Sequence, residues 1–181
     1  MNRLQGKVAI VTGAAGGFGE GIARLFVAEG AKVLIADLDA DKAQQVAASL
    51  GAQARSVRCD VSKRADIDAA LKACVDAFGA PDIVVNNAGT THRNQSMLDV
   101  DETTFDRVFA VNVKSIYHMT QAVVPLMKAR KSGCIVNIGS TAGIRPRPGL
   151  SWYNASKGAV NVLSKSMAAE LGPDGIRVNA V

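Results

Sequence analysis

Short apolar runs alternate with longer stretches of helical periodicity along the whole chain, and this alternation limits the possible folds most strongly. Several runs, such as KVAIVT at residues 7–12, are almost continuously apolar. Parallel strands covered on both faces need such runs. The sequence therefore predicts an α/β fold: a doubly wound parallel sheet with helices on both faces and right-handed crossovers. The expected strands are 7–12, 32–37, 53–58, 82–86, 133–139 and 175–180, and the expected helices are 18–29, 41–50, 64–78, 103–130 and 154–171.

Glycines mark the ends of the expected helices. Gly30, Gly51, Gly79 and Gly172 each follow such a helix, and we expect them to be left-handed C-terminal caps. No linker or low-complexity tract interrupts the pattern. Residues 1–181 are therefore expected to form a single domain.

A glycine-rich turn lies between the first expected strand and the first expected helix. It reads Thr-Gly-Ala-Ala-Gly-Gly-Phe-Gly at residues 12–19, with Gly13, Gly17 and Gly19 in the spacing G-x-x-x-G-x-G. Glycines let the backbone approach a pyrophosphate, which the N–H groups and dipole of the helix N-terminus stabilise. Loops also collect glycine for purely conformational reasons, so the place of this turn at the first crossover favours a dinucleotide site more than its composition does.

An acidic residue, Asp37, ends the second expected strand. A carboxylate at this position can accept hydrogen bonds from an adenosine ribose. It would repel a 2′-phosphate, and no Arg or Lys follows until Lys42, so the sequence favours NAD over NADP. Asp37 can also be explained as a turn or capping residue before the next helix, a role that Asp39 or Asp41 could equally fill.

Polar residues in three further places are candidates for a functional site. Tyr153 and Lys157 are one helical turn apart on the same face of an expected helix, although such pairs are common on helix surfaces. Ser140 follows an expected strand at its carboxyl end, the edge where open α/β sheets bind ligands. Asn112 is a polar residue in mid-helix, where an amide is usually solvated.

Together these motifs resemble the short-chain dehydrogenase/reductase family. The resemblance rests on the glycine turn, Asn-Asn-Ala-Gly at 86–89, Asn112, Ser140 and Tyr-x-x-x-Lys at 153–157, and it extends over the whole chain. It implies a Rossmann sheet with strand order 3-2-1-4-5-6 and a catalytic tetrad of Asn112, Ser140, Tyr153 and Lys157. The cofactor-binding positions that it implies are Gly13, Ala15, Gly17, Phe18, Gly19, Asp37, Leu38, Asp60, Val61, Asn87, Ala88, Gly89, Tyr153 and Lys157.

The resemblance also implies a mechanism. A hydride moves between a nicotinamide and a secondary alcohol or ketone, while Tyr153 exchanges a proton with the oxygen. Lys157 favours the phenolate, since a cation about 4 Å away contributes about 4 kcal/mol at an effective dielectric of about 20. Ser140 orients the reacting oxygen, and Asn112 holds a water that links Lys157 to solvent. Sugar or polyol dehydrogenases and β-ketoacyl-carrier reductases share these motifs, and a carrier could use Arg130 or Lys131.

Other expectations follow from the same family likeness. Relatives continue past a strand like the one at 175–180, so the chain is expected to lack the usual last strand and the region that covers the substrate. A catalytically impaired nucleotide-binding fragment is therefore one alternative to an enzyme. A redox-sensing module that binds nucleotide without catalysis is a separate one. We expect a homodimer or homotetramer formed through the helices that carry Asn112 and Tyr153.

Composition excludes several other functions. The net charge of +5 is dispersed and aromatic residues make up 4%, which argues against nucleic-acid binding. No run is long enough for a membrane span or a signal-peptide core. Three scattered cysteines fit a reducing compartment, so we expect a cytoplasmic protein. His92 and His118 have no second ligand at metal-binding spacing, so no metal site is expected, and both are predicted to lie at the surface or in an interface.

Overall fold

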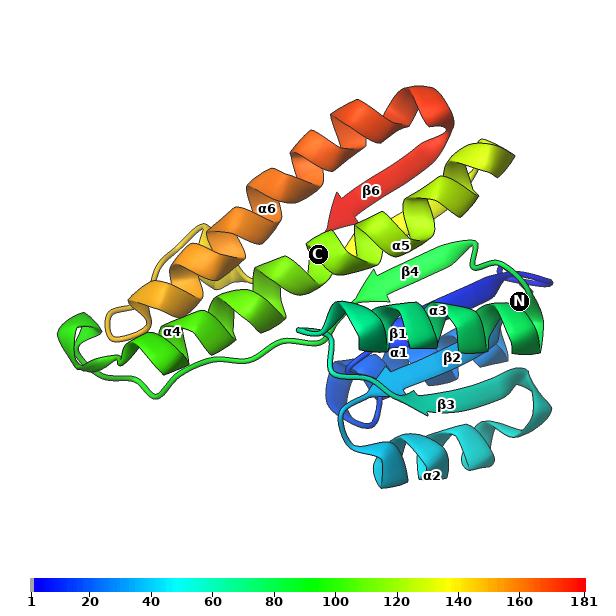
Figure 1. Ribbon diagram of the computed structural model, residues 1–181, viewed down its shortest axis with the longest axis horizontal. Coiled ribbons are helices and arrows are strands. Elements are labelled where there is room, and N and C mark those ends of the chain that lie inside the picture. The colour runs from blue at the N-terminus through cyan, green and yellow to red at the C-terminus, as the bar shows by residue number, and fades with distance from the viewer. Residues whose placement is uncertain (1) are drawn as a thin grey trace.

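A six-stranded parallel sheet in the order β3-β2-β1-β4-β5-β6 forms the centre of the molecule (Figure 1). The structure is a computed structural model that describes residues 2–181. Its strands are β1 (Val8–Thr12), β2 (Lys32–Asp37), β3 (Ala54–Arg58), β4 (Ile83–Asn86), β5 (Gly133–Asn137) and β6 (Ile176–Ala180). The predicted sheet and its strand order are confirmed.

Helices cover both faces of this sheet. They are α1 (Gly17–Ala28), α2 (Ala40–Leu50), α3 (Arg64–Phe78), α4 (Glu102–Phe109), α5 (Ser115–Arg130) and α6 (Ser151–Leu171). Alternate residues of β1 explain the two layers: Val8 and Ile10 join a core with α3, α5 and α6, whereas Ala9 and Val11 join a core with α1 and α2. Because both faces are buried, the strand has to be apolar throughout.

The expected helix 103–130 is interrupted by a π-helical turn at Ala110–Lys114. Periodicity could not reveal it, because the apolar pattern continues through the turn. The Tyr153 helix also begins at Ser151 and not at 154, so the tyrosine lies in its first turn.

Three of the four predicted glycine caps have positive φ angles: 93° at Gly30, 72° at Gly51 and 95° at Gly79. The ψ angles of −147° at Gly51 and −176° at Gly79 are extended, so these two glycines end their helices without the predicted left-handed helical conformation. The prediction for Gly172 is wrong, because its φ is −55° and the chain continues there into a further helical turn. Gly175, with φ 73°, takes the left-handed position after that turn.

Both histidines are buried, with 5% of His92 and 8% of His118 exposed, so the predicted surface position is wrong. Within residues 2–181 no group of three or more His, Cys, Asp or Glu side chains could hold a metal ion. None of the helices in the described part of the chain has the length and apolar character needed to cross a membrane.

A buried row of polar side chains joins β4, β5 and α6. The Asn86 Nδ2 donates to Asn137 Oδ1 at 2.8 Å, and the Asn137 Nδ2 donates to Ser164 Oγ at 2.9 Å. Asn137 is fully buried, and Ser164 donates onward to the Val160 carbonyl. Since buried polar groups must be paired, this row fixes α6 laterally on the sheet.

We predict that Asn137→Leu lowers the free energy of unfolding by about 1–3 kcal/mol, because it leaves the Asn86 amide unpaired in the interior. Urea denaturation measures the change. Asn179→Leu, at an exposed position of β6, is the matched control and is expected to change stability by less than about 0.5 kcal/mol. Equal effects of the two substitutions would contradict the role of the polar row.

Candidate active site

A cavity of about 910 Å³ opens at the carboxyl edge of the sheet. It collects residues from the glycine turn, from the segments after β4 and β5, and from α6. Three of the four predicted tetrad residues, Ser140, Tyr153 and Lys157, line it together. Its lining residues are Phe18, Ile22, Asn87, Gly89, Thr90, Thr91, Ile138, Gly139, Ser140, Thr141, Leu150, Tyr153, Lys157 and Val181.

Lys157 carries a buried ammonium in the wall of this cavity. The residue is 5% exposed, and its Nζ donates to the Ile138 carbonyl at 2.7 Å. Burial lowers the pKa of Lys157, because the charged form loses its hydration. Within residues 2–181 no carboxylate forms an ion pair with this group. Lys157 therefore brings to the cavity wall a cation that none of these ion pairs neutralises.

The segment that carries Ser140 is fixed tightly against α6. Ser140 caps the short turn Thr141–Gly143, and its Oγ accepts a hydrogen bond from the Ala142 N–H at 3.1 Å. At Gly143 a side chain would come within 2.6–2.7 Å of the α6 backbone at Lys157 and Gly158. The glycine lets the two segments touch, so the serine hydroxyl and the lysine are held in one arrangement.

Asn112 lies in the π-helical turn and is 3% exposed, so it is not a solvated mid-helix amide. Its Nδ2 donates to the Thr90 carbonyl and to Ser156 Oγ, both at 2.9 Å, and its Oδ1 accepts from the Thr90 N–H at 2.8 Å. Asn112 therefore connects the segment after β4 to α6. Ser156 and Thr90 have no motif signal in the sequence and were not predicted.

A second cavity of about 360 Å³ lies beside the first, and Gly89 and Thr90 line both. It brings together most of the positions predicted for the adenosine half of a cofactor. Its lining residues are Gly13, Asp37, Leu38, Cys59, Asp60, Val61, Ala88, Gly89, Thr90, Arg107 and Val111. Arg107 comes from α4, far away in the sequence, so the sequence did not predict it.

The Asp37 carboxylate forms a hydrogen bond with the backbone of the glycine turn. Its Oδ2 accepts from the Ala15 N–H at 2.9 Å and its Oδ1 accepts from the Asp39 N–H at 3.0 Å. The cap of α2 is Asp39, which accepts from the Lys42 N–H, so Asp37 is not the capping residue. Its contact with the Asp39 N–H, two residues further on, is that of a turn residue, so the turn half of the alternative is confirmed. Ala15 lines neither cavity.

The glycines of the turn have different structural roles. Gly13 and Gly17 have φ of 63° and 56°, which other residues rarely adopt. A side chain at Gly19 would collide with the Gly13 carbonyl and with Asn87, whose Nδ2 donates to the carbonyls of Thr12 and Gly13 at 2.8 and 2.9 Å. Phe18 is 85% exposed at the mouth of the larger cavity.

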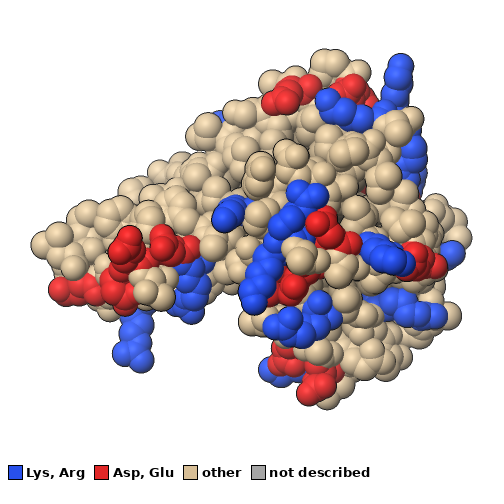
Figure 2. Space-filling model, viewed as in Figure 1, with Lys and Arg blue, Asp and Glu red and all other residues tan. Residues whose placement is uncertain are grey.

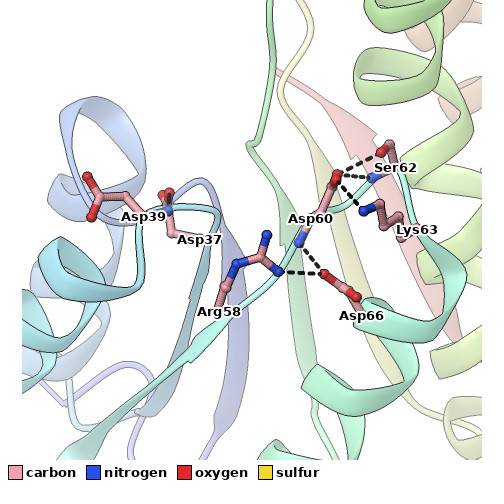
Figure 3. Close-up of polar contacts among 7 residues, drawn as sticks. All are labelled: Asp37, Asp39, Arg58, Asp60, Ser62, Lys63 and Asp66. Carbon is pink, nitrogen blue, oxygen red and sulfur yellow. Dashed lines mark hydrogen bonds and ion pairs between the residues drawn. The ribbon is translucent and has the colours of Figure 1, made fainter.

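A network of polar contacts surrounds Asp60 (Figure 3). Asp60 Oδ1 accepts from the Ser62 N–H and Oγ at 3.1 and 2.6 Å, and Lys63 Nζ is 3.8 Å from Oδ2. The hydrogen bond from the Ser62 side chain is the main reason why the pKa of Asp60 is lowered. The smaller cavity thus has two carboxylates in its wall, from Asp37 and Asp60.

Arg130 and Lys131 lie at the opposite edge of the sheet from this site, so they are not placed for the contact with a carrier that the sequence analysis considered. Arg130 donates to the carbonyls of Ala80 and Pro81, which precede β4, at 3.1 and 2.6 Å. Figure 2 shows that basic side chains alternate with acidic ones on the visible face and form no continuous stripe.

Three comparisons bear on the identity of this site. A family model described as short chain dehydrogenase matches residues 7–181. The 4-formylbenzenesulfonate dehydrogenase of Comamonas testosteroni is 49% identical over 181 residues, covering 98% of this chain and 72% of that protein. Galactitol 2-dehydrogenase of Agrobacterium fabrum is 43% identical over 180 residues, covering 99% of this chain and 70% of that protein.

A solved structure has the same fold. The crystal structure of 3-ketoacyl-(acyl-carrier-protein) reductase from Brucella melitensis, complexed with NADH, matches with a TM-score of 0.96 and 47% sequence identity. The match covers 98% of this chain and 75% of that one. On these matches, which extend over nearly all of its length, the chain belongs to the short chain dehydrogenase family of oxidoreductases.

Proposed function

We propose that the protein is an NAD-dependent oxidoreductase that interconverts a secondary alcohol and a ketone, with Tyr153 as general acid and base. The observation that carries this proposal is the single cavity lined by Ser140, Tyr153 and the buried Lys157. A hydroxyl, a phenol and a desolvated ammonium around one cavity match the needs of proton exchange at a carbonyl oxygen.

The residues present fit a dinucleotide that extends through both cavities. At Gly89 an added Cβ would lie 3.5 Å from Asn112 Oδ1 and 3.6 Å from Lys157 Nζ, so the glycine leaves open the space that these two polar atoms face. Asp37, Leu38, Asp60 and Val61 would hold the adenosine half, and Lys157 and Tyr153 the nicotinamide ribose. The dinucleotide would supply or accept the hydride.

The chain's own groups account for the proton. Ser140 Oγ would donate to the substrate oxygen and orient it. Tyr153 would give a proton to that oxygen or take it away, and the adjacent ammonium of Lys157 would stabilise the phenolate. Asn112 Oδ1 keeps one free acceptor position, through which it would hold a water next to Lys157.

A sugar, a polyol or a 3-oxoacyl thioester is the substrate class that we propose. Galactitol 2-dehydrogenase and 3-ketoacyl-(acyl-carrier-protein) reductase, both more than 40% identical, support these two alternatives. A carrier protein would have to dock without Arg130 and Lys131. A nucleotide-binding module without catalysis is less well supported, because all four tetrad residues are present and three share one cavity.

We further propose a homodimer or homotetramer formed through α4, α5 and α6, which carry or flank Asn112 and Tyr153. Tyr117 on α5 is 56% exposed and offers an apolar contact there.

Tyr153→Phe is expected to lower turnover at least about 100-fold, because it removes the proton that the substrate oxygen needs. Cofactor affinity should stay nearly unchanged. Absorbance of reduced nicotinamide, followed across sugars, polyols and β-ketoacyl esters with NAD and NADP, measures turnover. Tyr117→Phe, at the exposed tyrosine of α5, is the control and should remain active. A Tyr153→Phe variant that keeps most of its activity would exclude the proposed acid–base role.

Gly89→Ala is expected to weaken NADH binding while leaving the melting temperature nearly unchanged. Its methyl group would make only ordinary contacts of 3.5–3.7 Å within the protein, but it would occupy the space that joins the two cavities. Nicotinamide fluorescence titration and a thermal melt test the two expectations. Gly21→Ala on α1, where nothing lies within 4 Å, is the control. Wild-type NADH affinity in Gly89→Ala would contradict the proposed path of the cofactor.

A further inference from the structure

One carboxylate oxygen of Asp66, in the first turn of α3, accepts two hydrogen bonds of different kinds. Asp66 Oδ2 accepts from the Asp60 backbone N–H at 2.9 Å and from Arg58 Nη1 at 3.3 Å. The first contact supports a wall of the smaller cavity, because Asp60 lines it. The second holds the side chain of a basic residue. Figure 3 shows the Arg58 guanidinium turned toward Asp66 and away from the segment that carries Asp37 and Asp39.

Arg58 is the partner of Asp37 across the sheet. The two residues end β3 and β2, and they are paired in the parallel register. Paired residues of neighbouring strands point to the same face, so their side chains share the carboxyl edge. The Cys59 N–H donates to the Asp37 carbonyl at 2.7 Å, which keeps the two strand ends together. A cation therefore adjoins Asp37 although none follows it closely in the sequence.

The two lysines that follow the ends of β2 and β3 are engaged in ion pairs. Lys42 Nζ is 2.8 Å from Asp39 Oδ2, and Lys63 Nζ is 3.8 Å from Asp60 Oδ2. The Arg58 side chain is 55% exposed and Asp66 is 24% exposed, so this ion pair can open to solvent at little cost. A guanidinium binds phosphate through two parallel hydrogen bonds, which suits Arg58, the partner of Asp37 in the strand register, as a phosphate ligand at this strand edge.

We propose that Arg58 and Asp66 are specificity residues that set the choice between NAD and NADP together with Asp37. Asp66 is a positioning residue: it holds Arg58 away from the place where a 2′-phosphate on the adenosine ribose would lie. This inference rests on the proposed function, in which the smaller cavity binds the adenosine half of the cofactor.

This arrangement predicts a graded preference for NAD over NADP, set by the balance between the carboxylates and Arg58. Asp37, Asp60 and Asp66 surround the strand ends with negative charge, and the hydrogen bond from the Ser62 side chain lowers the pKa of Asp60. These carboxylates disfavour a 2′-phosphate. Arg58 opposes them only when its contact with Asp66 opens, so removal of the Asp66 charge should release the guanidinium and admit the phosphate.

The test is a set of fluorescence titrations with NADH and NADPH on the full chain. Asp66→Asn keeps an oxygen that can accept from the Asp60 N–H but loses the charge that holds Arg58. We expect it to raise the ratio of NADPH to NADH affinity about fivefold, the scale of one partly exposed ion pair. The gain should shrink as salt is added, because it is electrostatic.

Arg58→Gln supplies the second arm and is expected to fold normally because its side chain lies at the surface. It should lower NADPH affinity about threefold or more, with NADH affinity nearly unchanged. In the double variant Asp66→Asn/Arg58→Gln, the gain from Asp66→Asn should disappear. Asp68→Asn is the matched control, since Asp68 lies on the same helix and pairs with Arg64 at 2.8 Å outside both cavities. It should change neither affinity.

Equal changes in NADH and NADPH affinity in the single variants would overturn the inference and leave Asp66 with a structural role alone. A gain in Asp66→Asn that persists without Arg58 would overturn it as well. Both results leave the proposed function standing, since the wild-type chain would still bind NADH. A wild-type chain that binds neither dinucleotide would overturn the proposed function and this inference together.

Discussion

The buried ammonium of Lys157 is the constraint on which the arrangement of the site depends. A charge inside a protein has to be compensated, and here one carbonyl, that of Ile138, provides its hydrogen bond. The charge is tolerable only while α6 stays in place on β5. Three separate features keep it there: the polar row through Asn137, the close approach at Gly143, and the contact of Asn112 with Ser156. Stability and chemistry are thus provided by the same contacts.

At the smaller cavity, hydrogen bonds likewise hold the glycine turn against the segment after β4. Asn87 donates its amide hydrogens to the carbonyls of Thr12 and Gly13, and Asp37 accepts from the Ala15 N–H. Both side chains form hydrogen bonds with backbone groups of the turn, whose glycines have no side chain that could do so. Asp37, for which the sequence predicted either a ribose contact or a turn role, therefore shapes the glycine turn. Substitution at Asp37 would alter the shape of the glycine turn together with the proposed ribose contact.

Much of the fold could be predicted from the sequence, because strands buried on both faces must be apolar throughout and β1 is such a strand. Motif positions likewise predicted Ser140, Tyr153 and Lys157, which the structure brings together. Contacts that depend on sheet register or on helix packing have no corresponding pattern in the sequence. Arg58 adjoins Asp37 only through strand pairing, and Ser156 meets Asn112 only because two helices pack. His92 and His118 were misplaced, since residue type alone does not report burial.

The π-helical turn at Ala110–Lys114 has a consequence for the phase of the helix around it. A π turn accommodates one residue more than an α-helical turn, and each residue of an α-helix advances about 100° around its axis. Side chains before the turn are therefore rotated relative to those after it. Arg107 can reach the smaller cavity and Phe105 can meet Trp152 edge-on at 5.3 Å, while Met119 and Val123 of α5 point into the core. The phase shift at this turn thus accompanies a change of role along one long segment, which lines the smaller cavity before the turn and the core after it.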